Sequence, residues 1–222
     1  MAGSVLPRSL QWLVVFMCLA GTMVARVECA ASKSDKKVLV TCGSVLKLKS
    51  EKSKHLLHSL DVNYGSGSGQ QAVIGTPTED SAESLWLVRG PVVKPGNKAV
   101  HCPQGTPIAK NMPIRLQHMG TKKWLHSHLF SSPLSNQQEV SCFGSDQQSD
   151  TGDVWIVEWD GGEKFWEQDM GVKLKHKDTG AYLSNHMQKY QRPIAGNTEV
   201  YASKKTGKEA VFKAGEGVYF SL

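Results

Sequence analysis

The chain has 222 residues, of which 40% are hydrophobic and 21% are charged, and its formal net charge at pH 7 is +6. This composition excludes fibrous, intrinsically disordered and multi-spanning membrane proteins. The basic residues are scattered through the sequence, so it lacks the clustered Lys/Arg patch that nucleic-acid binding requires.

The first 31 residues have the pattern of a secretory signal peptide. Arg8 precedes an apolar run over 12–20, and Cys29-Ala30-Ala31 supplies small residues at a cleavage site. The apolar stretch 12–25 is shorter than the roughly 20 residues that a membrane-spanning helix needs. We therefore predict a signal peptide over 1–31, with an uncleaved anchor as the alternative, and no membrane span in the mature chain.

The rest of the sequence reads as short strands. Apolar-alternating runs are cut by Gly, Pro, Asn and Ser, and helical periodicity is almost absent, which predicts an all-β chain. The runs 45–48, 114–118 and 172–176 are equivalent, because each carries a leucine that is followed nine residues later by another. Polar turn residues lie between the two leucines, which indicates a hairpin that occurs three times.

Each hairpin is followed by a valine-containing strand and then by a bulky aromatic residue. One such four-stranded unit cannot bury its apolar face or hide its edges, whereas three can close around a shared axis. We therefore predict one all-β domain, a β-trefoil over 38–217, with repeats at 38–92, 106–161 and 162–217. The inward layers are predicted to be Leu48/Leu116/Leu174, Leu57/Leu125/Leu183 and Trp86/Trp155/Phe212.

Three cysteines, Cys42, Cys102 and Cys142, follow the predicted signal peptide. An odd number in an oxidising compartment indicates one disulfide and one thiol. In a trefoil the start of the first strand lies beside the end of the fourth, so Cys42–Cys102 is the favoured pair. Connectivity does not follow from spacing alone. Cys142 is then expected to be a buried, small apolar residue.

Several motifs resemble the repeats of a known family. The segments 57–59 (LHS), 124–128 (WLHSH) and 182–184 (YLS) look like the core of MIR repeats. More specifically, the chain resembles the stromal cell-derived factor 2 family over about 38–220. The matching segments are 40–45 (VTCGSV), 61–71 (DVNYGSGSGQQ), 132–135 (SPLS), 138–141 (QEVS), 190–194 (YQRPI) and 216–219 (EGVY).

This resemblance implies a protein of the endoplasmic reticulum lumen, without catalytic activity, that acts in protein quality control. Its implied partners are a luminal J-domain co-chaperone, the Hsp70 of that compartment and misfolded secretory proteins. The chain departs from the family in three places. It ends Tyr219-Phe220-Ser221-Leu222 in place of an HDEL-like tetrapeptide, so secretion stays open. Leu60 replaces a second histidine, and Phe212 replaces a tryptophan.

The candidate binding residues lie on predicted loops or strand ends within the matching motifs. They are Tyr64, Gln70, Gln71, His126, His128, Tyr190 and Arg192. Packing within loops is the alternative role for each. A carbohydrate-binding module that recognises O-mannosyl or related glycans is the alternative function, with Trp124 or Tyr190 as a stacking platform.

Other kinds of site find little support in the sequence. The glycine-rich segment 64–69 lacks the Lys-Ser/Thr of a phosphate-binding loop. His118, His126 and His128 could bind zinc, but structural or hydrogen-bonding roles are favoured because no acid or cysteine in the motif completes the set. No GxSxG motif or nucleophile setting occurs. We therefore predict no enzyme activity, no cofactor and no metal.

Overall fold

The computed structural model describes residues 37–91 and 102–221, so the predicted signal peptide lies outside the described residues. The described chain is almost entirely β-structure, with twelve strands in one sheet network. The elements of the first third are β1 (Val45–Ser50), β2 (Leu56–Asn63), β3 (Gln71–Thr76), the 3-10 helix η1 (Ala82–Ser84) and β4 (Trp86–Arg89). The second third has β5 (Pro113–His118), β6 (Trp124–Ser131), β7 (Gln138–Phe143), η2 (Thr151–Asp153) and β8 (Trp155–Glu158). The last third has β9 (Gly171–His176), β10 (Tyr182–Lys189), β11 (Thr198–Ser203), η3 (Lys208–Ala210) and β12 (Phe212–Val218).

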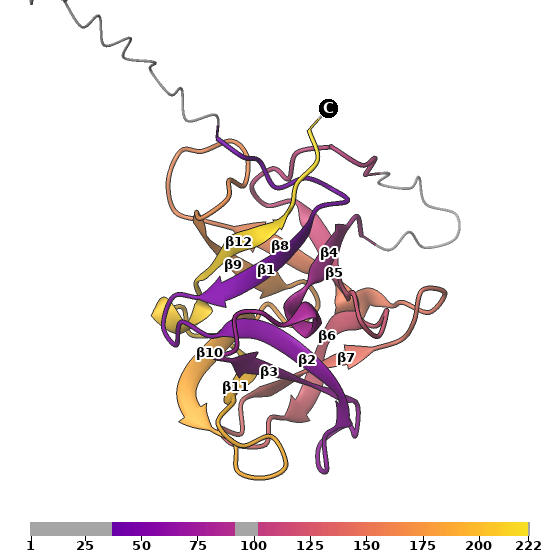
Figure 1. Ribbon diagram of the computed structural model, residues 1–222, viewed down its shortest axis with the longest axis vertical. Coiled ribbons are helices and arrows are strands. Elements are labelled where there is room, and N and C mark those ends of the chain that lie inside the picture. Colours follow the sequence, from indigo (N-terminus) through magenta and orange to yellow (C-terminus); the bar gives the residue numbers. More distant parts are fainter. Residues whose placement is uncertain (1–36, 92–101, 222) are drawn as a thin grey trace, which may run out of the picture. The chain divides into compact units, whose positions relative to one another are not determined.

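The strands form a closed barrel and a cap. The barrel follows from successive antiparallel pairings of β1 with β4, β4 with β5, β5 with β8, β8 with β9, β9 with β12 and β12 with β1. The hairpins β2–β3, β6–β7 and β10–β11 extend from one end of this barrel (Figure 1). Their strands β3, β7 and β11 pair with one another in a triangle and so close the cap. This is a β-trefoil, as predicted; the exact repeat bounds stay a prediction.

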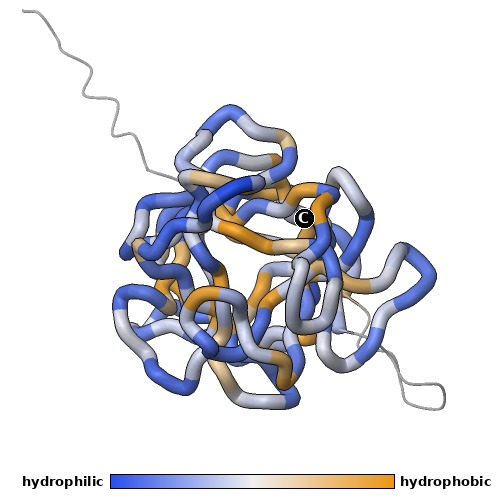
Figure 2. Tube along the Cα trace, turned by 90° about the horizontal axis from the view of Figure 1, so that it is seen from below, coloured by the Kyte–Doolittle hydropathy of each residue, from blue (hydrophilic) through white to orange (hydrophobic). Residues whose placement is uncertain are grey.

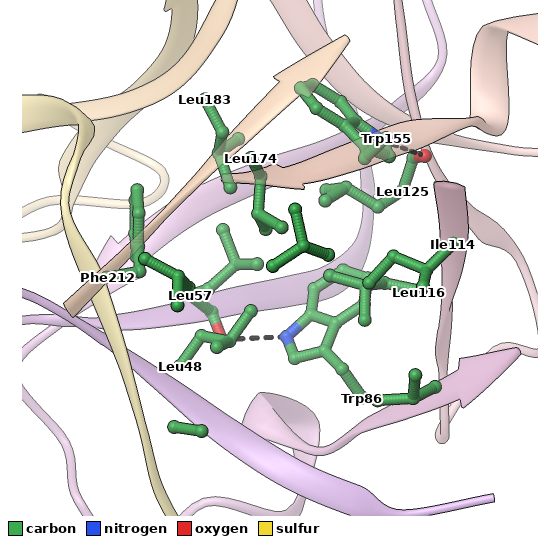
Figure 3. Packing of buried hydrophobic residues seen from close by; sticks show 14 of the residues in the cluster. Leu48, Leu57, Trp86, Ile114, Leu116, Leu125, Trp155, Leu174, Leu183 and Phe212 are labelled. Atoms are coloured by element: carbon green, nitrogen blue, oxygen red, sulfur yellow. Dashed lines mark hydrogen bonds between the residues drawn. The ribbon is translucent and has the colours of Figure 1, made fainter. Parts of the chain in front are cut away.

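The three predicted leucine and aromatic layers lie in one core. Every one of their nine side chains is at most 1% exposed, and Figure 3 shows them converging on a common centre. The Trp86 indole donates to the Leu57 carbonyl at 2.9 Å, and the Trp155 indole donates to the Leu125 carbonyl at the same distance. Phe212 takes the same place in the third repeat without a donor. The core therefore fixes the angle of two of the cap hairpins against the barrel by hydrogen bonds and that of the third by packing.

The hydropathy of the residues along the chain agrees with this central core. Most hydrophobic segments of the trace lie toward the middle of the molecule, and the outer turns are mostly hydrophilic (Figure 2). Among residues 37–91 and 102–221, no helix has the length and hydropathy needed to span a bilayer.

The cysteines are arranged as expected. Cys42 and Cys102 form a disulfide, and Cys142 on β7 is a buried free thiol. Burial raises the pKa of Cys142 to about 12. The thiol is therefore protonated at neutral pH and serves as a small core residue.

Three buried histidines, His58, His118 and His176, pack beside tryptophan rings or a hydroxyl group. His118 packs against Trp86 with ring centres 5.1 Å apart, and His176 packs against Trp155 in the same way at 5.0 Å. His58 lies 2.9 Å from the Ser84 hydroxyl. Burial lowers the pKa of all three imidazoles, that of His58 to about 4, with a smaller contribution from His118. These groups are neutral in the folded state at pH values where the unfolded chain takes up protons.

We predict that the free energy of unfolding falls as the pH is lowered through 6.5. Because the folded-state pKa of His58 lies below the unfolded value, the unfolded chain binds more protons between pH 6.5 and about 4. His58 alone should then account for a loss of about 2 kcal/mol between pH 7 and pH 5. Urea unfolding at the two pH values measures this loss, and His58→Gln should show a difference smaller by that amount. An equal pH dependence in the variant would contradict the assignment.

Candidate functional site

The ends of the three cap hairpins carry equivalent loops. The amide of Tyr64 donates to the Gln70 carbonyl, that of Ser132 to Gln137, and that of Tyr190 to Asn197, at 2.7–2.9 Å. Tyr64, Ser132 and Tyr190 are thus the same position in three repeats. All three are buried, so each loop begins with a side chain turned into the cap.

Tyr64 and Tyr190 hold the loops from inside. The Tyr64 hydroxyl donates to the carbonyl of Val73, 2.9 Å away, or that of Val140, 3.0 Å away. Burial raises the pKa of both tyrosines above the ordinary range. The Tyr190 hydroxyl has no hydrogen-bond partner among the described residues. Tyr64 and Tyr190 were predicted as binding residues, with packing within the loops as the alternative, and both rings are buried beneath their loops, as that alternative describes.

Two buried carboxylates anchor two of the loops. Glu139 on β7 accepts hydrogen bonds from the amide and hydroxyl of Ser68, and His128 Nε2 lies 3.2 Å from its Oε1. Glu199 on β11 accepts from the amides of Leu134 and Ser135, at 2.7 and 3.1 Å, and lies 2.9 Å from His186 Nε2. The second and third repeats thus each supply a His–Glu pair that fixes the loop of the preceding repeat.

The first repeat replaces this pair by apolar residues. Strand register places Leu60 and Ala72 where the other repeats have histidine and glutamate. Ala72 belongs to a small apolar cluster against which Leu60 and Ile194 pack. The loop 190–197 is therefore held by packing, and the absence of a second histidine in the first repeat is matched by the absence of its glutamate partner.

Gln70 and Gln71 serve the scaffold in different ways. Gln70 is half-buried, and its Oε1 accepts a hydrogen bond from Ser141. Gln71 is buried at the start of β3, where its Nε2 donates to Ser59 at 2.8 Å and to Thr121 at 3.0 Å. Gln71 therefore ties its hairpin to the barrel turn of the next repeat and is not free to bind a ligand.

The three histidines considered for zinc do not form one site. His118 lies about 3 Å from Thr121 Oγ1 and from the Glu83 carbonyl, so both ring nitrogens are engaged. The rings of His126 and His128 are 5.1 Å apart on β6. His118 therefore does not join the other two.

His126 is buried next to acids that come from η2. Its Nδ1 lies 2.9 Å from Asp153 and 3.6 Å from Asp150, and these atoms lie within 4.8 Å of one another. Asp153 also accepts from Ser149 and from the Asp150 amide, which closes the capping box of η2. This donor pattern explains the cluster as a support for the turn that precedes β8.

The remaining predicted positions differ in exposure. Arg192 is exposed on the loop 190–197, and His128 is half-buried. Trp124, considered as a sugar-stacking platform, is buried; Arg115 covers its ring at 4.1 Å, and its indole donates to the Ser145 carbonyl. Trp124 and Tyr190 therefore offer no free aromatic face, and that part of the glycan hypothesis is wrong.

The structure exposes a feature that the sequence analysis missed. Leu129 and Phe130 at the end of β6 are 87% and 50% exposed. They lie within a register shift between Ser127 and Ser131, where β6 bulges away from β7. Two consecutive large apolar residues interrupt the alternation of this strand, and that interruption is the signal that could have indicated them.

Hollows lie on both sides of Phe130. One is bounded by Leu129, Phe130, Gln137 and Lys204. The other is bounded by Phe130, Gly67 of the preceding repeat, and Pro133. Residues of the carboxylate-anchored loops 64–70 and 132–137 thus line the hollows beside Phe130.

We predict that Glu199→Ala releases the loop 132–137. Two backbone amides and His186 would lose a buried acceptor, at a cost of about 2 kcal/mol in the free energy of unfolding. The pKa of Glu199 lies below its usual value: burial raises it, but hydrogen bonds from His186, Ser135 and Leu134 outweigh that effect. This stabilisation should be present above pH 4.5 and disappear as the pH falls through the folded-state pKa.

Urea unfolding and hydrogen exchange at the Leu134 and Ser135 amides test this. The exposed Asp160→Asn variant, which loses a surface ion pair with Lys173, should change stability by less than about 1 kcal/mol. Unaltered exchange at both amides in Glu199→Ala would refute the anchoring role.

Comparison with known proteins places this geometry in a family. The MIR domain model matches residues 47–211. The stromal cell-derived factor 2-like protein of Arabidopsis thaliana is 48% identical over 193 residues, which cover 87% of this chain and 86% of that protein. Human stromal cell-derived factor 2 is 44% identical over 181 residues, covering 82% of each chain.

Solved structures agree. The crystal structure of the SDF2-like protein from Arabidopsis thaliana matches with a TM-score of 0.78 and 49% identity, over 83% of this chain and 99% of that chain. The S. cerevisiae protein O-mannosyltransferase Pmt1–Pmt2 complex bound to the sugar donor matches with a TM-score of 0.71 and 28% identity. This match covers 84% of this chain and 27% of that chain. With three MIR repeats closed into one trefoil, the chain belongs to the stromal cell-derived factor 2 family.

Proposed function

We propose that this protein is a non-enzymatic component of protein quality control in the endoplasmic reticulum lumen. It binds misfolded secretory polypeptides and acts with a luminal J-domain co-chaperone and, through it, with Hsp70. Membership of the stromal cell-derived factor 2 family supports this partnership. The predicted signal peptide over 1–31 supports the location.

The observation that carries the proposal is the exposed apolar pair Leu129 and Phe130 at the rim of the cap. Of the six exposed large hydrophobic residues in the described chain, four lie near the far ends of the cap hairpins: Val62, Leu129, Phe130 and Met187. Of these four, Leu129 and Phe130 are adjacent and line one hollow, and neighbouring exposed apolar side chains of this kind mark sites of interaction with other chains. The loops 64–70 and 132–137 beside this pair are fixed by the buried carboxylates of Glu139 and Glu199, so the surface is pre-organised for binding.

The acids and histidines of the cap support a binding role over a catalytic one. Glu139, Glu199 and Asp153 are fully buried and accept hydrogen bonds from the side chains or backbone amides that they hold. A general base needs a lone pair directed at a substrate. These carboxylates direct theirs at the scaffold.

The mature chain should keep an unfolded secretory protein in solution. We expect it to reduce light scattering by a reduced, denatured client at an equimolar ratio and to co-elute with a luminal J-domain protein in size-exclusion chromatography. A variant with both Leu129 and Phe130 changed to serine should lose most of the suppression, because the paired apolar area is gone.

Val218→Ser is the matched control, because Val218 is 58% exposed at the barrel end. It should suppress aggregation as well as the native chain does. A native chain that neither reduces scattering nor co-elutes with the J-domain protein would contradict the proposed function.

Glycan binding is a second candidate function. A hollow of about 270 Å³ is lined by Tyr201, Ser184 and Gln137, together with Glu209. Hydroxyl, amide and carboxylate groups of this kind can hydrogen-bond the hydroxyl groups of a sugar. The similarity to the domain within the O-mannosyltransferase complex also favours it. Calorimetric titration with O-mannosyl peptides tests this candidate, and the absence of heat at millimolar ligand would exclude it.

A further inference from the structure

The trefoil provides an internal comparison, because equivalent positions meet the same packing demands. At the bulge of each cap hairpin, strand register aligns Asp61-Val62, Leu129-Phe130 and Met187-Gln188. Only the second repeat has two large apolar residues there. The other two repeats fold with a charged or polar residue in one of these places, so the scaffold does not require Leu129 and Phe130 together.

A second departure from the threefold pattern concerns charge. The loops that lead from the cap to the 3-10 helices are 77–81 (PTEDS), 144–150 (GSDQQSD) and 204–207 (KKTG), the last being followed by Lys208 of η3. The first two are acidic, and the third is basic. Lys204, Lys205 and Lys208 are exposed, and within the described chain no carboxylate lies within 4 Å of their ammonium groups. The third loop therefore carries positive charge that the protein leaves uncompensated.

The two departures meet at one place. Leu129 and Phe130 form one wall of the first hollow, and Lys204 lies across from them. Lys204 Nζ donates to the Thr179 carbonyl and keeps other protons that it can donate to a ligand. Asn136 and Gln137, both exposed, line the same hollow with amide groups. We call this area, Leu129, Phe130, Asn136, Gln137 and Lys204, the Phe130 surface.

Resting on the proposed function, we propose that the Phe130 surface is the client-binding site. Its ligand is an extended polypeptide segment in which large apolar residues alternate with acidic ones. An apolar side chain would lie against Leu129 and Phe130, and a carboxylate would pair with Lys204. The exposed amides of Asn136 and Gln137 can hydrogen-bond the peptide backbone. Mixed apolar and basic contacts of this kind select a peptide by composition and not by one fixed sequence.

Fluorescence anisotropy with three labelled peptides tests the proposal. The first alternates Phe and Leu with Asp and Glu, the second has Lys in place of the acids, and the third has Ala in place of the apolar residues. The native mature chain should bind the first peptide most tightly. Phe130→Ser should weaken that binding about tenfold, because the central aromatic contact is lost. Lys204→Glu should shift the preference from the acidic to the basic peptide.

Matched controls separate this surface from general effects. Val62→Ser changes the equivalent position of the first repeat, and Lys164→Glu makes the same charge change on an exposed lysine of the loop between β8 and β9. Both should bind the acidic peptide as the native chain does. All four variants alter half-exposed or exposed side chains, so their unfolding midpoints should stay near that of the native chain.

Equal binding by the Phe130→Ser and native chains, or equal loss in Val62→Ser, would overturn the proposal. A native chain that suppresses client aggregation but does not discriminate among the three peptides would also overturn it, and the proposed function would stand. A native chain that neither suppresses aggregation nor binds any peptide would reject both.

Discussion

The whole structure depends on closure around one axis. A four-stranded unit of this chain has an apolar face and open edges that it cannot cover alone, and three units remove both problems together. The barrel strands pair in an unbroken ring, and β3, β7 and β11 complete a triangle of pairings in the cap. The indoles of Trp86 and Trp155 then bond to backbone carbonyls of the cap hairpins and fix the cap against the barrel.

Closure also determines how the cap loops are held. Because each cap hairpin contacts the next, a residue of one repeat supports the loop of another, as Glu139 supports Ser68 and Glu199 supports Leu134. Buried carboxylates are stable in such places only when donors satisfy them. Side chains at the outer rim are exposed to solvent and need no such buried partners. At the rim the three repeats differ in apolar character and in charge. In this account the shared residues make the scaffold and the divergent ones make the binding surface.

The sequence predicted the fold well because the fold depends on short-range periodicity. Equal spacing of leucines and aromatic residues in three repeats predicted the trefoil and its three core layers, and the trefoil topology in turn favoured the Cys42–Cys102 pair. The candidate site was predicted less well, for a physical reason. Motif position indicates that Tyr64 and Gln71 belong to a loop and a strand end, but not that they turn into the cap. Their contacts reach Val140 and Thr121, far along the chain.

The rim escaped prediction for a related reason. Leu129 and Phe130 look like strand residues, and only the bulge between Ser127 and Ser131 shows that both side chains reach solvent. Lys204 is close to them only because the third repeat closes against the second. The exposure of Leu129 and Phe130 and their proximity to Lys204 both depend on the tertiary structure. The order of residues in the sequence therefore could not predict this surface.

Photo-crosslinking at equivalent positions can show whether clients bind the second repeat's part of the rim in preference to the other two. A benzoylphenylalanine placed in turn at positions 62, 130 and 188 samples the same point of the scaffold in three repeats. On illumination with an unfolded secretory client, we expect strong crosslinking from position 130 and little from 62 or 188. Equal crosslinking from all three positions would show that the rim binds without regard to repeat and would contradict this expectation.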